Sequence, residues 1–188
     1  MTLLADAIAL AKGIAKPFEG WRPRRYKCPA GVWTQGWGHT GPGVDNTAWS
    51  PAKGDVVLDA DMAVYARGVL ALSPNLAKLP PPMLGALADF AFNLGTTRYK
   101  ASTLRRRVAV EDWRGVAHEL GKWVHGGGRK LPGLVKRRAA EARVILGAMA
   151  AKPAPALNDE AAFRGRVNEI LAAGGDVRAE LLKLLQAA

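Results

Sequence analysis

The chain has 188 residues, 49% of them hydrophobic, so it can bury one substantial core and is neither a disordered nor a fibrous protein. Its single cysteine, Cys28, excludes an internal disulfide, and packing must therefore hold the fold together. The formal net charge of +11 at pH 7 lies within residues 1–151, because residues 152–188 carry equal numbers of basic and acidic side chains. Nucleic acid, acidic wall polymers and anionic lipid would all be attracted by such a charge.

The first predicted element is a helix over residues 3–14, where apolar side chains recur at helical spacing. Thr2 is placed to cap its first turn, and Pro17 is expected to end it. The longest apolar run of this segment, Ala7 to Ala11, is too short for a signal peptide or a transmembrane helix. We therefore expect a soluble protein, without a transmembrane segment, that is made in the cytoplasm.

Glycine, proline and aromatic residues dominate the next segment, from residue 26 to about residue 58. The run Gly31-Val-Trp-Thr-Gln-Gly-Trp-Gly is typical of short strands joined by tight turns and predicts a small antiparallel sheet. Trp33 and Trp37 would share one face of a strand, with Thr34 between them on the other face.

Helical spacing returns after Asp59, which can cap a helix, and continues through most of the remaining chain. A break is expected at Gly126 to Gly128. The expected helices cover residues 60–72, 80–93, 102–109, 111–124 and 133–150. One helix, a small sheet and a mostly helical C-terminal lobe make an α+β fold class.

A stretch of alternating proline and alanine, Lys152-Pro-Ala-Pro-Ala, predicts a stiff linker. We place one main domain in residues 1–151 and a C-terminal helical extension in residues 152–188. Two amphipathic helices, over residues 159–171 and 177–185, are expected to form a helical hairpin in this extension. The hairpin would dock on the main domain or bind a partner.

Glu19 is one of only three carboxylates in the first fifty residues, with Asp6 and Asp45. It follows the first helix and precedes the glycine-rich segment, close to the apolar Phe18 and Trp21. Desolvation at such a place makes a carboxyl group hold its proton more tightly, as a general acid near neutral pH requires. Position alone, however, favours a surface residue or a helix cap.

The surrounding residues change this balance. Three motifs follow one another: Phe18-Glu-Gly-Trp-Arg, Tyr26-Lys-Cys-Pro-Ala-Gly-Val-Trp-Thr and Gly36-Trp-Gly-His-Thr. Together they resemble the signature of the phage lysozyme family, which includes the T-even and lambdoid endolysins. In that family an aspartate or cysteine lies nine positions after the glutamate, and a threonine lies six positions further on. These positions hold Cys28 and Thr34 here.

Later motifs extend the resemblance over residues 3–148, among them Asp89-Phe-Ala-Phe-Asn-Leu-Gly and Leu131-Pro-Gly-Leu-Val-Lys-Arg-Arg-Ala-Ala-Glu-Ala. The resemblance implies a two-lobed lysozyme fold with the substrate cleft between the sheet-bearing part and the helical lobe. It implies hydrolysis of the β-1,4 bond between N-acetylmuramic acid and N-acetylglucosamine in peptidoglycan glycan strands, without a metal or cofactor. We expect a monomer that waits in the host cytoplasm until a holin-type lesion lets it reach the wall; a virion-associated lysozyme is the nearest alternative.

In the mechanism that the resemblance implies, Glu19 protonates the departing glycosidic oxygen and Thr34 holds the attacking water. Cys28 departs from the T-even form, which has an aspartate there, and an ordinary thiol is a poor base at neutral pH. Cys28 would line the site as a spectator, activate water as a thiolate, or attack the sugar. The spectator role is slightly favoured over water activation, and attack on the sugar is the least favoured.

Three further residues are candidates for orienting roles. A histidine in the Gly-His-Thr turn could act as a base, but the resemblance favours His39 as a structural tie between the sheet and a neighbouring helix or the surroundings of Glu19. By analogy with an arginine of related lysozymes, Arg137 or Arg138 is expected to approach Glu19 from the helical lobe, and the sequence does not say which.

Two rival functions belong to other classes of protein. A wall-binding module without activity would not need the spacing from Glu19 to Thr34. A nucleic-acid binder would explain the charge, but no recognised DNA- or RNA-binding motif accompanies the basic runs, so we expect no nucleic-acid partner. Anionic cell-envelope polymers remain candidate partners beside peptidoglycan.

Overall fold

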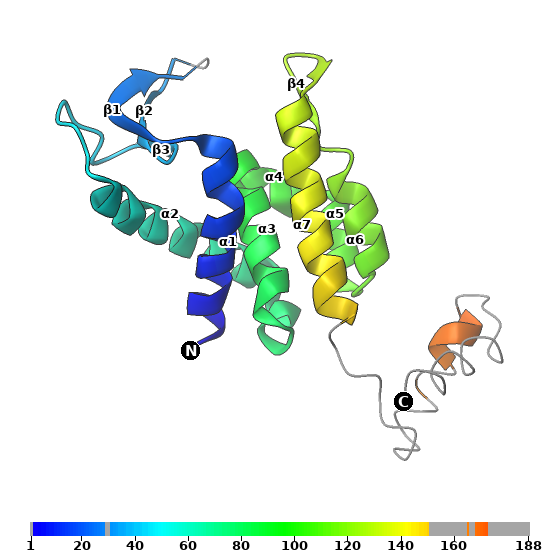
Figure 1. Ribbon diagram of the computed structural model, residues 1–188. Helices are drawn as coiled ribbons and strands as arrows, with labels where there is room; N and C mark the ends of the chain where they lie inside the picture. Colours follow the sequence, from blue (N-terminus) through cyan, green and yellow to red (C-terminus); the bar gives the residue numbers. More distant parts are fainter. Residues whose placement is uncertain (1, 29–30, 151–164, 166–167, 173–188) are drawn as a thin grey trace. The chain divides into compact units, whose positions relative to one another are not determined.

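The computed structural model describes residues 2–28, 31–150, 165 and 168–172 (Figure 1). Its contacts divide the chain into two units, residues 1–149 and 150–188. In the second unit, residue 165 and residues 168–172 are helical. The predicted hairpin of residues 152–188 otherwise lies outside the described residues, and the predicted domain boundary stays a prediction.

Helix α1 (Leu3–Glu19) begins as predicted but runs five residues beyond the expected end. Thr2 Oγ1 caps it by accepting a hydrogen bond from the Ala5 amide. Pro17 lies inside the helix, so the prediction that it ends the helix is wrong. A proline so near the C-terminus removes only one helical hydrogen bond, and burial of α1 against a neighbouring helix offsets that loss.

The predicted small antiparallel sheet is present, with strand order β1-β2-β3. Strand β1 (Arg22–Lys27) pairs with β2 (Trp33–Gly36), which pairs with the short β3 (His39–Thr40). Because β2 ends at Gly36, Trp37 lies in the following turn. The prediction that Trp33 and Trp37 share one face of a strand is therefore wrong.

Helix α2 (Pro51–Leu72) begins nine residues before the predicted start. Ser50 is the N-cap, accepting from the Lys53 amide at 3.2 Å, and Pro51 occupies the first turn. Asp59, the predicted cap, lies within the helix and forms an ion pair with Lys12 of α1. The glycine- and proline-rich composition hid this start, since Ser-Pro also favours turns.

The rest of the first unit is helical apart from one hairpin. Two short elements, η1 and α4, were not predicted, and α6 is shorter than expected, whereas α3, α5 and α7 agree closely with their predicted ranges. The predicted break at Gly126 to Gly128 is part of a β-hairpin, with Gly126 in the first strand and Gly127 and Gly128 in the turn. The elements are η1 (Pro74–Lys78), α3 (Pro81–Leu94), α4 (Thr96–Ala101), α5 (Thr103–Ala109), α6 (Trp113–Leu120), β4 (His125–Gly126), β5 (Arg129–Lys130) and α7 (Pro132–Ala150).

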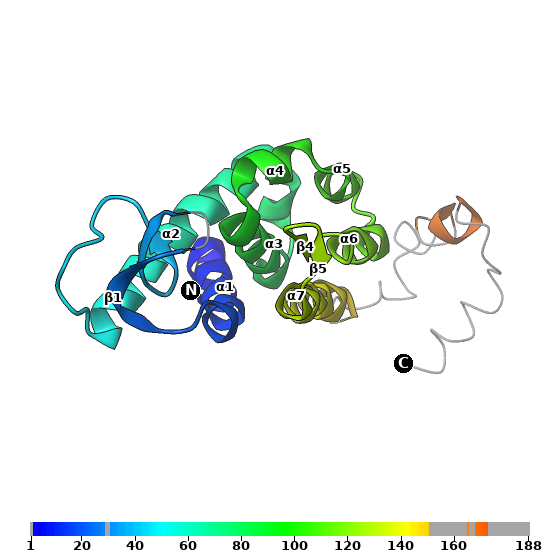
Figure 2. The same ribbon diagram turned by 90° about the horizontal axis from the view of Figure 1, so that it is seen from above.

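Helix α3 is the centre of the unit, because nine consecutive residues, Met83 to Ala91, are buried. Seen from above, α3 lies between α1 and α2 on one side and α6 and α7 on the other (Figure 2). Gly85 permits the close approach of α1, since a Cβ there would lie 2.7 Å from the Ala7 carbonyl oxygen. Trp113, the first residue of α6, and Trp123, which follows that helix, both pack into this core.

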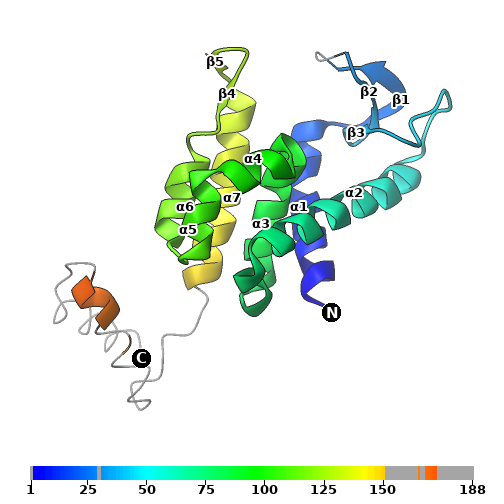
Figure 3. The same cartoon turned by 180° about the vertical axis from the view of Figure 1, so that it is seen from behind.

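The three-stranded sheet and the β4–β5 hairpin project from the same end of the unit (Figure 3). The sheet sits over the C-terminal end of α1 and the first turns of α2, and the hairpin leads into the start of α7 (Figure 1). The α+β prediction is therefore confirmed. Among the described residues, no helix combines the length and apolar character needed to cross a membrane.

Candidate active site

Glu19 is the last residue of α1, and the helix ends there because Gly20 adopts a positive φ of 69°. Its side chain is 22% exposed, so solvent and substrate can reach it. Oε1 accepts a hydrogen bond of 2.6 Å from Arg137 Nη1. Oε2 lies against the turn after β2: a Cβ on Gly38, where φ is 85°, would be 2.8 Å from it. The carboxyl group is therefore held between α7 and the sheet.

Arg137 reaches Glu19 from α7 and is almost completely buried, with 3% of its side chain exposed. Its Nε and Nη2 donate to the two oxygens of Asp89 in α3, at 2.9 and 2.6 Å. Burial alone lowers the pKa of Arg137, but hydrogen bonds and charge from Asp89, with the charge of Glu19, raise it above its ordinary value. Arg137 is therefore a permanent cation fixed by two carboxylates.

Arg138, the other candidate from the sequence, is directed elsewhere. Its Nη2 lies 2.6 Å from Glu141 Oε1 and donates to Asn93 at 3.2 Å. Burial raises the pKa of Glu141 well above its ordinary value; the charge of Arg138 opposes this rise and the neighbouring Asp89 adds to it. Of the two arginines, Arg137 is the one that the structure brings to Glu19.

Thr34 and Cys28 meet at the turn between β1 and β2. Thr34, on β2, is 4% exposed, and its Oγ1 donates to the Val32 carbonyl oxygen at 3.2 Å. The amide of the half-buried Cys28 donates to the same oxygen at 2.9 Å. The shared acceptor ties the Thr34 side chain and the Cys28 backbone to the same point of the turn.

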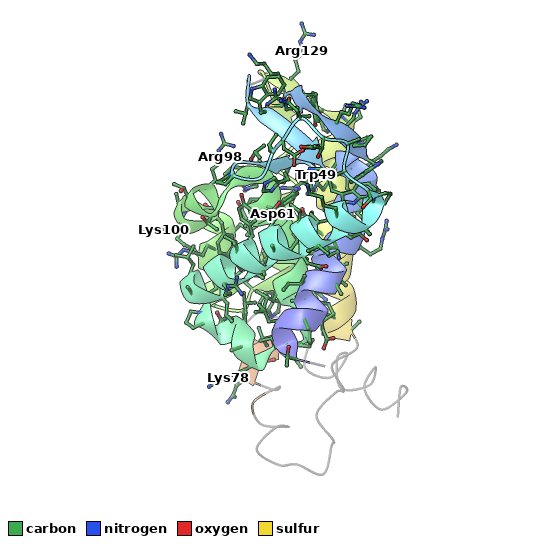
Figure 4. The ribbon with its side chains drawn as sticks, turned by 90° about the vertical axis from the view of Figure 1, so that its left-hand side faces the viewer. Trp49, Asp61, Lys78, Arg98, Lys100 and Arg129 are labelled. Atoms are coloured by element: carbon green, nitrogen blue, oxygen red, sulfur yellow. The ribbon has the colours of Figure 1, made fainter. Side chains whose placement is uncertain are left out.

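His39 ties the sheet to α2. Its Nδ1 lies 2.8 Å from Asp61 Oδ2, and its Nε2 lies 3.1 Å from the Pro42 carbonyl oxygen. The ring also packs against Trp49, with centroids 5.9 Å apart; Trp49 and Asp61 are labelled in Figure 4. Nδ1 thus holds β3 against α2, whereas Nε2 contacts the loop that follows β3.

The tryptophans of the sheet differ in their surroundings. Trp33 is 43% exposed, with the cations of Arg25 and Lys27 over its ring at 4.3 and 5.4 Å. Trp37 instead packs on Trp21, 5.1 Å away between ring centroids, and donates to Asp55 of α2. Trp33 therefore forms a cationic, exposed aromatic face, whereas Trp37 secures the sheet.

Two acidic residues of the site received no role from the sequence, although both lie in quoted motifs: Asp89 and Glu141. Asp89 interrupts a buried stretch of α3, and Glu141 is completely buried in α7; an ionisable side chain in such a place needs a partner. The sequence offered one signal for this pairing: an acidic residue lies within the apolar run Met83 to Phe92, and two adjacent arginines lie in the last helix of the main domain.

Basic residues are exposed on several elements of the first unit. Arg22, Arg24, Pro23 and Tyr26 line a cavity of about 530 Å³ on β1. In Figure 4, Arg98 and Lys100 of α4 and Arg129 of the hairpin point outward. In the described part of the chain, no three His, Cys, Asp or Glu side chains gather in a way that could hold a metal ion.

Comparisons with known proteins agree on one family. The Phage lysozyme family model matches residues 16–141. The chain is 35% identical over 138 residues to an endolysin of Acyrthosiphon pisum secondary endosymbiont phage 1, covering 68% of this chain and 89% of that protein. It is 30% identical over 145 residues to a SAR-endolysin of Bacteriophage PS119, covering 76% and 85%. The muramidase domain of SpmX from Asticaccaulis excentricus superposes with a TM-score of 0.63 at 27% identity, covering 74% of this chain and 94% of that domain.

Proposed function

Because the chain belongs to the phage lysozyme family, we infer that it is an endolysin, a glycoside hydrolase that cleaves peptidoglycan to lyse the host cell. We propose that the bond cleaved is the β-1,4 bond between N-acetylmuramic acid and N-acetylglucosamine. The observation that carries the proposal is the partly exposed Glu19 carboxyl group, held by a buried arginine at the junction of helix and sheet.

In the proposed mechanism Glu19 is the general acid. Since Arg137 Nη1 donates to Oε1, the proton available for transfer is carried by Oε2. Transfer of that proton to the glycosidic oxygen breaks the bond to the departing sugar as positive charge develops on the other ring. The carboxylate left behind keeps its hydrogen bond to Arg137, which stabilises the charge that the step creates.

Thr34 is proposed to orient the attacking water. Its hydroxyl proton is engaged with the Val32 carbonyl, so the oxygen is left to accept a hydrogen bond from water. That interaction would turn a lone pair of the water toward the sugar. His39, Arg137 and Arg138 are proposed to act indirectly: His39 by holding β3, Arg137 through Glu19, and Arg138 by packing the helices.

The products test this reaction. Hydrolysis of purified peptidoglycan in ¹⁸O-labelled water is expected to give N-acetylmuramic acid reducing ends that carry the label, measured by mass spectrometry. Ends closed as 1,6-anhydro sugars would contradict hydrolysis, and released stem peptides with intact glycan strands would contradict glycosidase activity altogether. A heat-denatured sample is the control.

Cys28 is proposed to be a spectator that lines the site. Cys28→Ser keeps nearly the same side-chain shape but cannot supply a thiolate. We therefore expect Cys28→Ser to keep activity within about tenfold of the original chain, measured as release of reducing ends. Near-complete loss, with unchanged thermal unfolding, would assign water activation or nucleophilic attack to the thiol.

The basic residues of β1 are proposed to attract anionic envelope polymers. Arg22 and Arg24 border the cavity on β1, and Arg25 and Lys27 stack on the exposed Trp33. Together they present cations beside an aromatic face, which raises the local concentration of a negatively charged polymer. This attraction would assist binding to the envelope.

Release to the wall is proposed to follow a holin-type membrane lesion. Relatives named SAR-endolysins, among them that of Enterobacteria phage P21, indicate signal-anchor release as the second route. Expression in a host without a holin separates the two: intact cells support the holin route, and lysis supports signal-anchor release.

A further inference from the structure

The catalytic proposal uses Glu19 and its arginine but leaves a buried carboxylate behind them without a role. Asp89 is completely buried in α3, the central helix, and both of its oxygens accept from Arg137. Burying a carboxylate is costly unless it is paired, and a buried pair adds little net stability over apolar side chains of similar size. Stability alone is therefore a weak reason for Asp89.

The guanidinium of Arg137 is held in one orientation. Two of its nitrogens are committed to Asp89, and the third, Nη1, points to Glu19 Oε1 at 2.6 Å. A planar guanidinium bound at two points cannot rotate, so its remaining donor direction is set by Asp89. The rings of Phe18 and Phe92 lie 5.8 and 5.9 Å from the guanidinium and keep it apart from water.

The charges around this group are also defined. The positive charge of Arg137 faces Asp89 from α3 and Glu19 from α1; on the far side, Arg138 and Glu141 of α7 face each other. The turn at Gly38 brings backbone against the Glu19 carboxyl group. The negative charge of Asp89 thus offsets part of the field that Arg137 exerts on Glu19.

We propose that Asp89 is a positioning residue for the reaction: it aims Arg137 at Glu19 and limits how strongly the arginine favours the ionised form of that acid. This inference rests on the proposed role of Glu19 as the proton donor. Asp89 acts on orientation through its two hydrogen bonds and on protonation through its charge, and the two actions can be separated.

The test compares Asp89→Asn and Arg137→Lys, both assayed on soluble glycan-strand fragments at temperatures below their measured unfolding. Asp89→Asn weakens the two-point hold and removes the charge. We expect kcat to fall about 100-fold with KM changed less than about threefold, and the alkaline limb of the pH–rate profile to move to lower pH. The limb moves down because the undivided charge of Arg137 favours ionised Glu19, whereas a proton donor must be protonated.

Arg137→Lys keeps the positive charge but loses the planar guanidinium that binds Asp89 at two points. We expect its kcat to fall as well while the alkaline limb stays in place, because Asp89 still offsets the ammonium charge. The matched control is Glu119→Gln, a mostly buried carboxylate of α6 paired with Lys122, which is expected to keep the original kcat and profile.

The outcomes are decisive in both directions. If both variants keep the original kcat and pH profile and lose only thermal stability, Asp89 is purely structural and the inference is wrong. If Asp89→Asn fails to fold, Arg137→Lys still tests the orientation step. Retained activity in Glu19→Gln would instead overturn the proton-donor role itself, so the two failures are distinguishable.

Discussion

Glu19→Gln is expected to lower the rate of peptidoglycan cleavage by about 10³-fold or more while leaving the protein folded and able to bind its substrate. The amide has nearly the shape of the carboxyl group, and its oxygen can still accept from Arg137 Nη1, so the contact between α1 and α7 survives. What is lost is the proton on Oε2. The measurement is turbidity of outer-membrane-permeabilised Gram-negative cells, with release of reducing ends from purified peptidoglycan.

Binding separates the rival explanations. Co-sedimentation with purified peptidoglycan is expected to be equal for Glu19→Gln and the original chain, because the substitution removes no contact to the wall. Equal clearing by both proteins would overturn the enzymatic role of Glu19. Tight binding without clearing by either protein would favour a wall-binding module.

Local rules predicted the main helices and the sheet in the right order but missed the short η1 and α4, and the two largest boundary errors both lie in the first half of the chain. Proline generally disrupts a helix, yet α1 continues through Pro17 because Ala11, Ile14 and Ala15 are buried on one face of the helix. The start of α2 was missed because Gly54 and Pro51 resemble turn residues. Gly54 is there for packing: a Cβ would collide with the Trp21 ring. Tertiary contact outweighed local preference in both places.

The candidate site was predictable where a motif fixed residue type and spacing, as for Glu19, Cys28 and Thr34. The choice between Arg137 and Arg138 was not, because adjacent helical residues point about 100° apart and only the position of α7 decides which one faces α1. Asp89 needed the same information, since its partner is 48 positions away in sequence.

Arg137→Met is expected to destabilise the first unit by about 3–5 kcal/mol and to remove most activity. The substitution leaves the buried Asp89 without the cation to which both of its oxygens are hydrogen-bonded, which costs far more than losing an exposed pair. The matched control is Lys12→Met, which breaks the ion pair of Lys12 with the half-exposed Asp59 between α1 and α2. That change is expected to cost about 1 kcal/mol or less, measured for both variants by denaturant unfolding.

The double variant Arg137→Met with Asp89→Leu is expected to separate the effect of Arg137 on stability from its effect on catalysis. With both charges gone, apolar side chains can fill a site already bordered by Phe18 and Phe92, and much of the lost stability is expected to return. Activity is expected to stay low, because nothing then donates to Glu19 Oε1 or stabilises the carboxylate left after proton transfer. Recovery of activity together with stability would mean that Arg137 serves the fold alone; recovery of stability without activity would mean that this chain retains a buried ion pair for the benefit of its acid.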